Sequence, residues 1–184
     1  MARTESAMLE LGTQAPPFSL KDVRDGRIHT SASLTGPQGL LVMFICAHCP
    51  FVKHVEKELA RLGDDYADSG VGIAAISSND ADSYPDDAPP SLAAQASRLG
   101  FTFPYLYDET QEVARAYDAT CTPDFFLFDA GGKLVYRGQL DESRPGNGVP
   151  VTGKDLRAAL DALAAGRPIS TEQRPSIGCN IKWK

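Results

Sequence analysis

Two uninterrupted apolar runs dominate the hydrophobic pattern of the chain, and each predicts a strand that is buried on both faces. The first run is Leu40-Leu41-Val42-Met43-Phe44-Ile45, and the second covers residues 71–77. Between them, residues 51–62 carry apolar side chains at helical spacing, namely Val52, Val55, Leu59 and Leu62. A strand, a helix and a second strand in this order predict two parallel strands joined by a right-handed crossover.

Weaker patterns predict short elements on either side of this unit. Strands are expected at residues 18–20, 27–30, 125–128 and 133–136, and helices at residues 91–99, 110–117 and 155–165. The segment Asp129-Ala130-Gly131-Gly132 is a hairpin signal, so the last two strands should be antiparallel. The alternation of strands and helices therefore predicts an α/β fold with a mixed central sheet.

The two ends of the chain show no clear pattern. The residues up to about Pro17 are expected to form a loose arm, and residues 166–184 a C-terminal tail that carries Cys179 and the only tryptophan, Trp183. A tail with such residues could dock on the rest of the protein. With 184 residues the chain is long enough for one well-packed domain and short for two. We expect a single domain, residues 1–184, with its core at about residues 11–165.

An acidic, proline-rich stretch follows the second apolar run. Residues 84–90 hold three prolines and two aspartates, which predicts an exposed loop. The acidic residues in and before this loop are Asp80, Asp82, Asp86 and Asp87. They lack the spacing and the glycine of a calcium-binding loop, so we expect them to be solvated.

Charge and hydropathy exclude several classes of partner. The formal net charge of -6 and the lack of a basic cluster argue against nucleic acid and anionic membrane surfaces. No segment approaches the roughly 20 apolar residues of a membrane span, and the N-terminus leads into no apolar core of a signal peptide. We therefore expect a cytoplasmic protein, in which a cysteine pair is more often catalytic or redox-sensing than structural.

The main chemical signal is Cys46-Ala47-His48-Cys49-Pro50, which joins the first apolar run to the predicted helix. At such a junction the unpaired N–H groups and the positive end of the helix dipole favour a thiolate. We therefore expect Cys46 to be acidic and to act as the nucleophile. Cys49 lies one helical turn later on the same face, within the Cα separation of roughly 4.4–6.8 Å that a disulfide tolerates. It is expected to resolve the mixed disulfide that Cys46 forms.

The spacing of this cysteine pair also suits a metal half-site. Structural zinc sites normally combine two such pairs, whereas Cys121 and Cys179 are single residues far along the chain. A copper or zinc site built from the pair and His48 or His54 is an alternative on ligand chemistry alone. The favoured prediction needs neither a metal nor an organic cofactor.

Three features occur together in the chain: the strand, Cys46-Ala47-His48-Cys49, helix unit; Thr122-Pro123 before a predicted strand; and the Phe128-Asp129-Ala130-Gly131-Gly132-Lys133 hairpin before Tyr136-Arg137-Gly138. Over roughly residues 11–165 they resemble the thioredoxin superfamily, and more closely its branch of alkyl hydroperoxide reductase and thiol-specific antioxidant proteins. Cys49-Pro50-Phe51-Val52-Lys53-His54 and Gly178-Cys179-Asn180-Ile181-Lys182-Trp183 look like segments of a peroxiredoxin-like subgroup. The resemblance implies a thioredoxin-like, three-layer α/β/α fold with a mixed central sheet and N- and C-terminal extensions.

The resemblance also implies a role for Pro123, and the place of His48 within the motif predicts one for that residue. In the thioredoxin fold a cis proline lies opposite the redox pair, which assigns that role to Pro123, and the backbone exposed there can pair with a substrate chain. His48 is expected to stabilise the Cys46 thiolate and to make the pair more oxidising. Related thioredoxins carry a buried acid six residues before the first cysteine, where this chain has Leu40. Deprotonation of Cys49 must then be helped by water, His48 or another group.

The favoured function is a thiol-disulfide oxidoreductase that acts on a disulfide-containing protein or a small thiol or peroxide and uses an external thiol reductant. The first alternative is a peroxiredoxin-like antioxidant peroxidase. Peroxiredoxins place a threonine and a proline before the reactive cysteine, where this chain has Cys46 and Val42 if Cys49 is that cysteine. They also place an arginine on a later strand, which in this chain opens with Thr122-Pro123-Asp124. Cys121 and Cys179 are candidate resolving thiols. A redox-sensing or metal-binding module without enzymatic activity is the second alternative.

Overall fold

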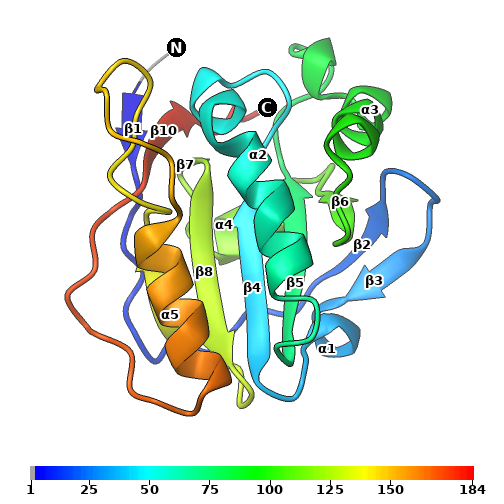
Figure 1. Cartoon of the computed structure of the whole chain (residues 1–184). Helices are drawn as coiled ribbons and strands as arrows, with labels where there is room; N and C mark the ends of the chain where they lie inside the picture. Colours follow the sequence, from blue (N-terminus) through cyan, green and yellow to red (C-terminus); the bar gives the residue numbers. More distant parts are fainter. Residues whose placement is uncertain (1–2) are drawn as a thin grey trace.

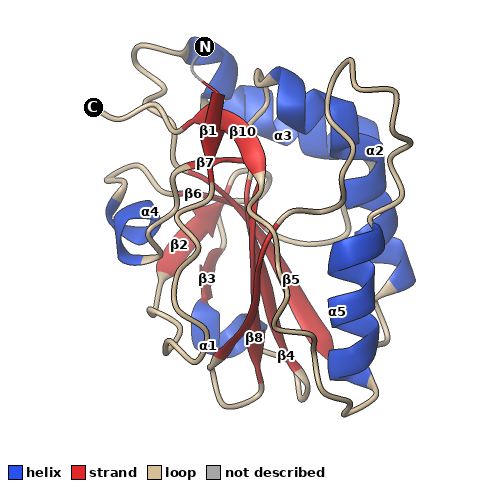
Figure 2. Cartoon of the chain, turned by 90° about the vertical axis from the view of Figure 1, so that its left-hand side faces the viewer, coloured by secondary structure: helices blue, strands red, loops and turns tan. Residues whose placement is uncertain are grey.

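The computed structural model describes residues 3–184 and places helices on both faces of a central sheet (Figure 1). The seven strands of this sheet are, in spatial order, β3 (Ile28–Thr30), β2 (Ser19–Asp22), β6 (Tyr105–Tyr107), β5 (Val71–Ser77), β4 (Gly39–Phe44), β8 (Asp124–Asp129) and β9 (Leu134–Gly138). Helices α2 (Pro50–Asp65), α3 (Pro89–Leu99) and α5 (Lys154–Ala164) cover one face, and α4 (Glu112–Ala116) lies on the other (Figure 2). The short helix α1 (Ser31–Leu34) follows β3. The predicted three layers are confirmed.

Strand β4 lies at the centre of the fold. It pairs in parallel with β5 and antiparallel with β8, so the sheet is mixed, as predicted. Leu41 and Met43 pack in the core beneath α2 and α5, whereas Leu40, Val42 and Phe44 pack in the core on the side of α4. Because both faces are covered, the run is apolar at every position instead of alternating.

The two ends of the chain meet in a second, three-stranded sheet. In it, β10 (Ile177–Asn180) lies between β1 (Arg3–Glu5) and β7 (Cys121–Thr122) and runs antiparallel to both. The expectation of a loose N-terminal arm is therefore wrong for residues 3–5, while the tail docks as expected. These strands are too short to show the alternation by which a strand is recognised in a sequence.

Three further details differ from the expectations. Helix α2 continues through Gly63, beyond the predicted end at residue 62, and α3 begins at Pro89, before the predicted start at residue 91. Prolines fill the first turn of α3, where their missing N–H groups would have had no partner in the helix. The expected exposed loop contains a 3-10 helix, η1 (Pro85–Asp87), and its Asp87 is fully buried.

Phe44 tests the packing on the α4 side of the sheet. Its ring centroid lies 5.6 Å from that of Tyr117 and 5.7 Å from that of Phe126. Phe44→Ala should lower the free energy of unfolding by about 3–5 kcal/mol, because truncation loses buried apolar area and leaves a cavity. Urea denaturation measures the loss. The control Ile28→Ala alters an exposed side chain and should change the value by less than about 0.5 kcal/mol; equal effects in the two variants would contradict this packing.

Candidate active site

Cys46 and Cys49 lie in the turn between β4 and α2, and both are fully buried. The Sγ atom of Cys46 lies 3.3 Å from Oγ1 of Thr122, and the Sγ atom of Cys49 lies 3.4 Å from the backbone oxygen of the same residue. A cis peptide bond joins Thr122 to Pro123. The structure therefore brings the predicted cysteine pair and the predicted proline together.

The other two cysteines lie on the neighbouring strands β10 and β7. Cys179 places its Sγ atom 2.7 Å from that of Cys49, and its backbone pairs with Thr122. The Sγ atom of Cys121 lies 3.7 Å from the carbonyl oxygen of Pro123. Of the two candidate resolving thiols, Cys179 is thus the one seen in contact with the pair.

The two cysteines of the motif differ in acidity, in the order opposite to the one expected. Cys49 is the N-cap of α2, and hydrogen bonds from the thiols of Cys46 and Cys179 lower the pKa of Cys49 to about 5, against the effect of its burial. Burial raises the pKa of Cys46 well above its usual value, and the adjacent Cys49 and the charge of Asp87 act in the same direction. The prediction of an acidic Cys46 is wrong because burial and its neighbours favour the protonated form of Cys46, whereas Cys49, at the N-cap of α2, accepts hydrogen bonds from the surrounding thiols.

His48 is held by a carboxylate that was expected to be solvated. One oxygen of Asp87 accepts hydrogen bonds from the backbone N–H groups of Ala47, at 2.8 Å, and His48, at 3.0 Å. Its other oxygen contacts Nδ1 of the His48 ring and accepts a hydrogen bond from the side-chain amide of Asn79 at 2.8 Å. The expected solvation of Asp87 is therefore wrong, and a residue of the site was missed.

The position of Asp87 follows from the topology. Since β4 and β5 are parallel neighbours, the loops that follow them share one edge of the sheet, where sites of α/β proteins form. An acidic residue in the loop after the second strand was thus a usable signal. Asp80, in the same loop, is also largely buried, whereas Asp82 and Asp86 are exposed as expected.

The ring of His48 lies against Tyr84, with 5.7 Å between centroids and 13° between planes. Its Nε2 atom is buried and has no hydrogen-bond partner among the described residues. With Nδ1 facing the Asp87 carboxylate, Nε2 is the nitrogen that remains free to exchange a proton.

One cluster near the pair has the residue types of a metal site. Cys46, His48 and Asp87 each place a ligand atom within 4.8 Å of the other two. This group differs from the one suggested by the sequence, because it contains Asp87 in place of Cys49. Each oxygen of Asp87 already has two hydrogen-bond partners within the protein. His54, the other histidine considered for a metal, contacts the hydroxyl of Ser143 at 2.6 Å.

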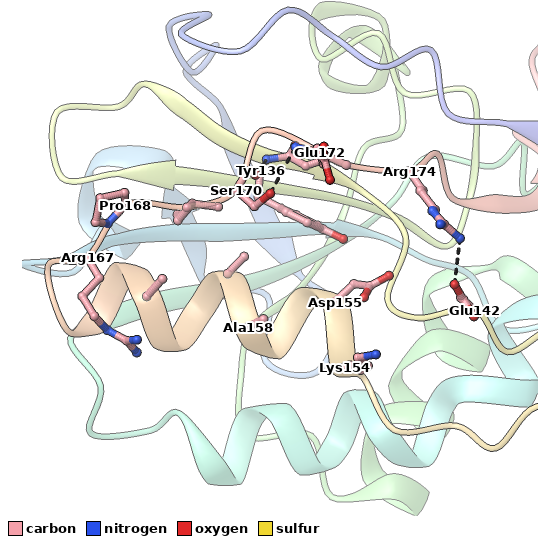
Figure 3. A pocket seen from close by; sticks show the side chains of 14 residues that line it. Tyr136, Glu142, Lys154, Asp155, Ala158, Arg167, Pro168, Ser170, Glu172 and Arg174 are labelled. Atoms are coloured by element: carbon pink, nitrogen blue, oxygen red, sulfur yellow. Dashed lines mark hydrogen bonds and ion pairs between the residues drawn. The ribbon is translucent and has the colours of Figure 1, made fainter.

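A cavity of about 620 Å³ lies beside α5 and the segment that precedes β10 (Figure 3). Charged side chains from several elements line it, including Lys154, Arg167 and Arg174, and the last of these forms an ion pair with Glu142 at 2.7 Å. Its lining contains no cysteine and no histidine. The cavity is therefore separate from the redox pair.

Known proteins resemble the chain in sequence and in structure. The model of the AhpC/TSA family matches residues 11–137. Thiol-disulfide oxidoreductase ResA of Geobacillus thermodenitrificans is 30% identical over 136 residues, which are 71% of this chain and 70% of that protein. An uncharacterized conserved protein from Geobacillus kaustophilus is 59% identical, with a TM-score of 0.98 over 100% of this chain and 97% of the other. A putative thiol:disulfide interchange protein DsbE from Chlorobium tepidum is 18% identical and shares the fold, with a TM-score of 0.66 over 85% and 99%.

These comparisons confirm the predicted enzyme class and correct the predicted location. Three curated relatives are named thiol-disulfide oxidoreductases. The prediction of a cytoplasmic protein is wrong, because oxidoreductases of the ResA type typically face the outside of the cytoplasm. Within residues 3–184, none of the helices combines the length and the apolar character of a membrane span. By its sequence match over residues 11–137 and by its fold, the chain belongs to the AhpC/TSA family of the thioredoxin superfamily.

Proposed function

We propose that Cys46 and Cys49 carry out thiol-disulfide exchange, with Cys49 as the attacking thiolate. The observation that carries this proposal is the position of Cys49 at the N-cap of α2, where neighbouring thiols lower its pKa to about 5. Cys46, whose pKa is raised, serves as the resolving thiol. The proposal keeps the pair expected from the sequence and reverses the order of attack.

The exchange proceeds in two steps. The Cys49 thiolate attacks one sulfur of the substrate disulfide, which forms a mixed disulfide and releases the other sulfur as a thiolate that takes up a proton. Cys46 then loses its proton and attacks the Cys49 sulfur, which forms the Cys46–Cys49 bond and releases the second substrate thiol. The substrate gains the two electrons that the pair loses, and an external thiol reductant returns the pair to the dithiol.

We assign the handling of the Cys46 proton to His48 and Asp87. The negative charge of Asp87 favours the protonated form of Cys46. The same carboxylate orients the His48 ring and leaves Nε2 free to accept a proton. Related thioredoxins carry a buried acid where this chain has Leu40. In this proposal, Asp87 supplies the carboxylate from a different loop.

Thr122 and Pro123 are the proposed positioning residues for the substrate. Thr122 contacts the sulfur atoms of both Cys46 and Cys49 through its hydroxyl and its backbone oxygen. An extended chain that pairs with this backbone in place of β10 would bring its own sulfur to the same place. The curated relatives, named thiol-disulfide oxidoreductases, support a disulfide-containing protein as the substrate.

Substitution of each thiol tests the order of attack. Cys49→Ser should abolish the reaction with oxidised glutathione, because no thiolate is left for the first step. Cys46→Ser should still react with oxidised glutathione and release glutathione in the first step, because that step does not need Cys46. Stopped-flow assays with mapping of the modified cysteines by mass spectrometry measure both. Cys121→Ser is the matched control and should react like the wild type; a reactive Cys49→Ser variant would refute the proposed order.

The pH dependence of thiolate formation gives an independent test. Because the pKa of Cys49 lies at about 5, this residue should be a thiolate at neutral pH and should gain its proton as the pH falls through that value. The ultraviolet thiolate absorbance of the wild type minus that of Cys49→Ser should therefore titrate near pH 5. An ordinary cysteine titrates near about pH 8.5, and a difference spectrum that does so would contradict the N-cap argument.

Asp87→Asn tests the carboxylate behind the pair. Removal of the negative charge should lower the pKa of Cys46, so the pH profile of the second step should shift to lower pH. The variant should also lose about 1–3 kcal/mol of unfolding free energy, since the new amide cannot satisfy all the donors that face Asp87. Rapid-quench kinetics and urea denaturation measure the two effects. Asp86→Asn, on the exposed neighbour, should change neither; an unshifted profile in Asp87→Asn would remove Asp87 from the mechanism.

A further inference from the structure

The C-terminal strand β10 occupies the place that the mechanism assigns to a substrate chain. It runs antiparallel to β7, with Cys179 opposite Thr122 and Asn180 opposite Cys121. Thr122 is the residue directly before the cis proline and the one that touches both motif sulfurs. The strand thus pairs with the backbone of β7 in the way that extended peptides bind to the edge of a sheet.

The strand also presents a sulfur to the reactive thiol. The Sγ atoms of Cys179 and Cys49 lie 2.7 Å apart, and Cys179 is only 2% exposed. Close contact between two sulfurs is the geometry from which thiol-disulfide exchange proceeds. Cys179 therefore combines both properties required of a substrate cysteine, a paired backbone and a sulfur that meets Cys49.

Gly178 makes this close approach possible. A Cβ atom at position 178 would lie 2.0 Å from the backbone oxygen of Thr122, a separation that no side chain can adopt. A residue without a side chain directly before Cys179 thus lets β10 settle against β7. Beyond the strand, the N–H group of Ile181 donates to the carbonyl of Thr120 at 3.1 Å, which continues the register.

The tail is also connected to the loop that holds His48. The N–H group of Lys182 donates to the Asn79 side chain at 2.9 Å, and the Asn79 amide donates in turn to Asp87 at 2.8 Å. The Lys182 carbonyl accepts from the N–H group of Asp80 at 2.8 Å. Docking of the tail and the ordering of the Asp87 loop therefore stabilise each other.

From these contacts we propose that Cys179 is a third redox thiol, which resolves the mixed disulfide on Cys49 from the position of a substrate. The proposal rests on the exchange reaction proposed above. The Cys179 thiol loses its proton and attacks the Cys49 sulfur; the Cys49–Cys179 bond forms, and the bond from Cys49 to the substrate sulfur breaks. The departing substrate thiolate takes up a proton. Cys46 can then attack Cys49 and release Cys179, which moves the disulfide to the Cys46–Cys49 pair without further oxidant.

Variants that lack Cys46 isolate this step. The reduced full-length Cys46→Ser protein is mixed with oxidised glutathione, quenched with acid at successive times, alkylated and mapped by mass spectrometry. We expect a Cys49–Cys179 disulfide and no lasting glutathione adduct. Cys46→Ser/Cys179→Ser should keep glutathione on Cys49, and the matched control Cys46→Ser/Cys121→Ser should behave like the parent variant. A lasting Cys49 adduct in Cys46→Ser itself would overturn the proposal.

The same experiment separates failure of this proposal from failure of the exchange reaction. If wild-type protein forms the Cys46–Cys49 disulfide while Cys46→Ser retains the adduct, only the role of Cys179 is refuted. If Cys49 reacts with glutathione in none of the variants, the exchange reaction and the role of Cys179 are refuted together.

Displacement of the strand gives a second test that keeps every thiol except Cys46. Gly178→Ala in the Cys46→Ser background should push β10 away from Thr122, because the new Cβ atom cannot fit. The conversion of the glutathione adduct to the Cys49–Cys179 disulfide should slow by roughly 100-fold, a loss typical of misplaced reacting groups. Conversion at the rate of Cys46→Ser would show that the strand does not position Cys179 and would overturn the proposal.

Discussion

The Asp87 carboxylate is the interaction on which the arrangement of the site depends. It accepts hydrogen bonds from two backbone N–H groups in the turn that carries the cysteines, contacts the His48 ring, and is bound by Asn79. A buried carboxylate is unfavourable unless donors surround it, so the turn after β4 and the loop after β5 must fold together. The geometry of Cys46 and Cys49 therefore depends on a residue far from both in the sequence.

Much of the fold could be predicted from the sequence because burial on both faces leaves a strong pattern. The apolar runs of β4 and β5, the helical stripe of α2 and the turn before β9 all appear as predicted. The second sheet could not be found in this way, because pairing of β1 and β7 with β10 depends on contacts between distant segments and not on any alternation within them. Hydrophobic patterns within a segment predict the structure of that segment. The order of the two ends of the chain comes instead from the pairing of one end with the other.

The sequence predicted the proximity of the cysteine pair and Pro123, but it did not predict the place of Asp87 or the order of acidity. The cysteine pair and Pro123 are brought together as expected, since few arrangements use such residues at this spacing. Asp87 was missed because an aspartate among prolines is typical of an exposed turn. The order of acidity was reversed because it depends on how deeply each thiol is buried and on which thiol accepts hydrogen bonds, and a sequence pattern shows neither. The peroxidase alternative gains no support from the site, since Cys46 stands where that chemistry would need a threonine.

The lack of a side chain at Gly178 indicates which other chains could pair with β7 in the same register. An external strand that pairs with β7 in the register of β10 must first replace β10. A Cβ atom on the residue before its cysteine would then lie 2.0 Å from the backbone oxygen of Thr122. A partner that binds in this register would therefore need glycine directly before its reactive cysteine. The protein's own C-terminus meets this requirement through Gly178.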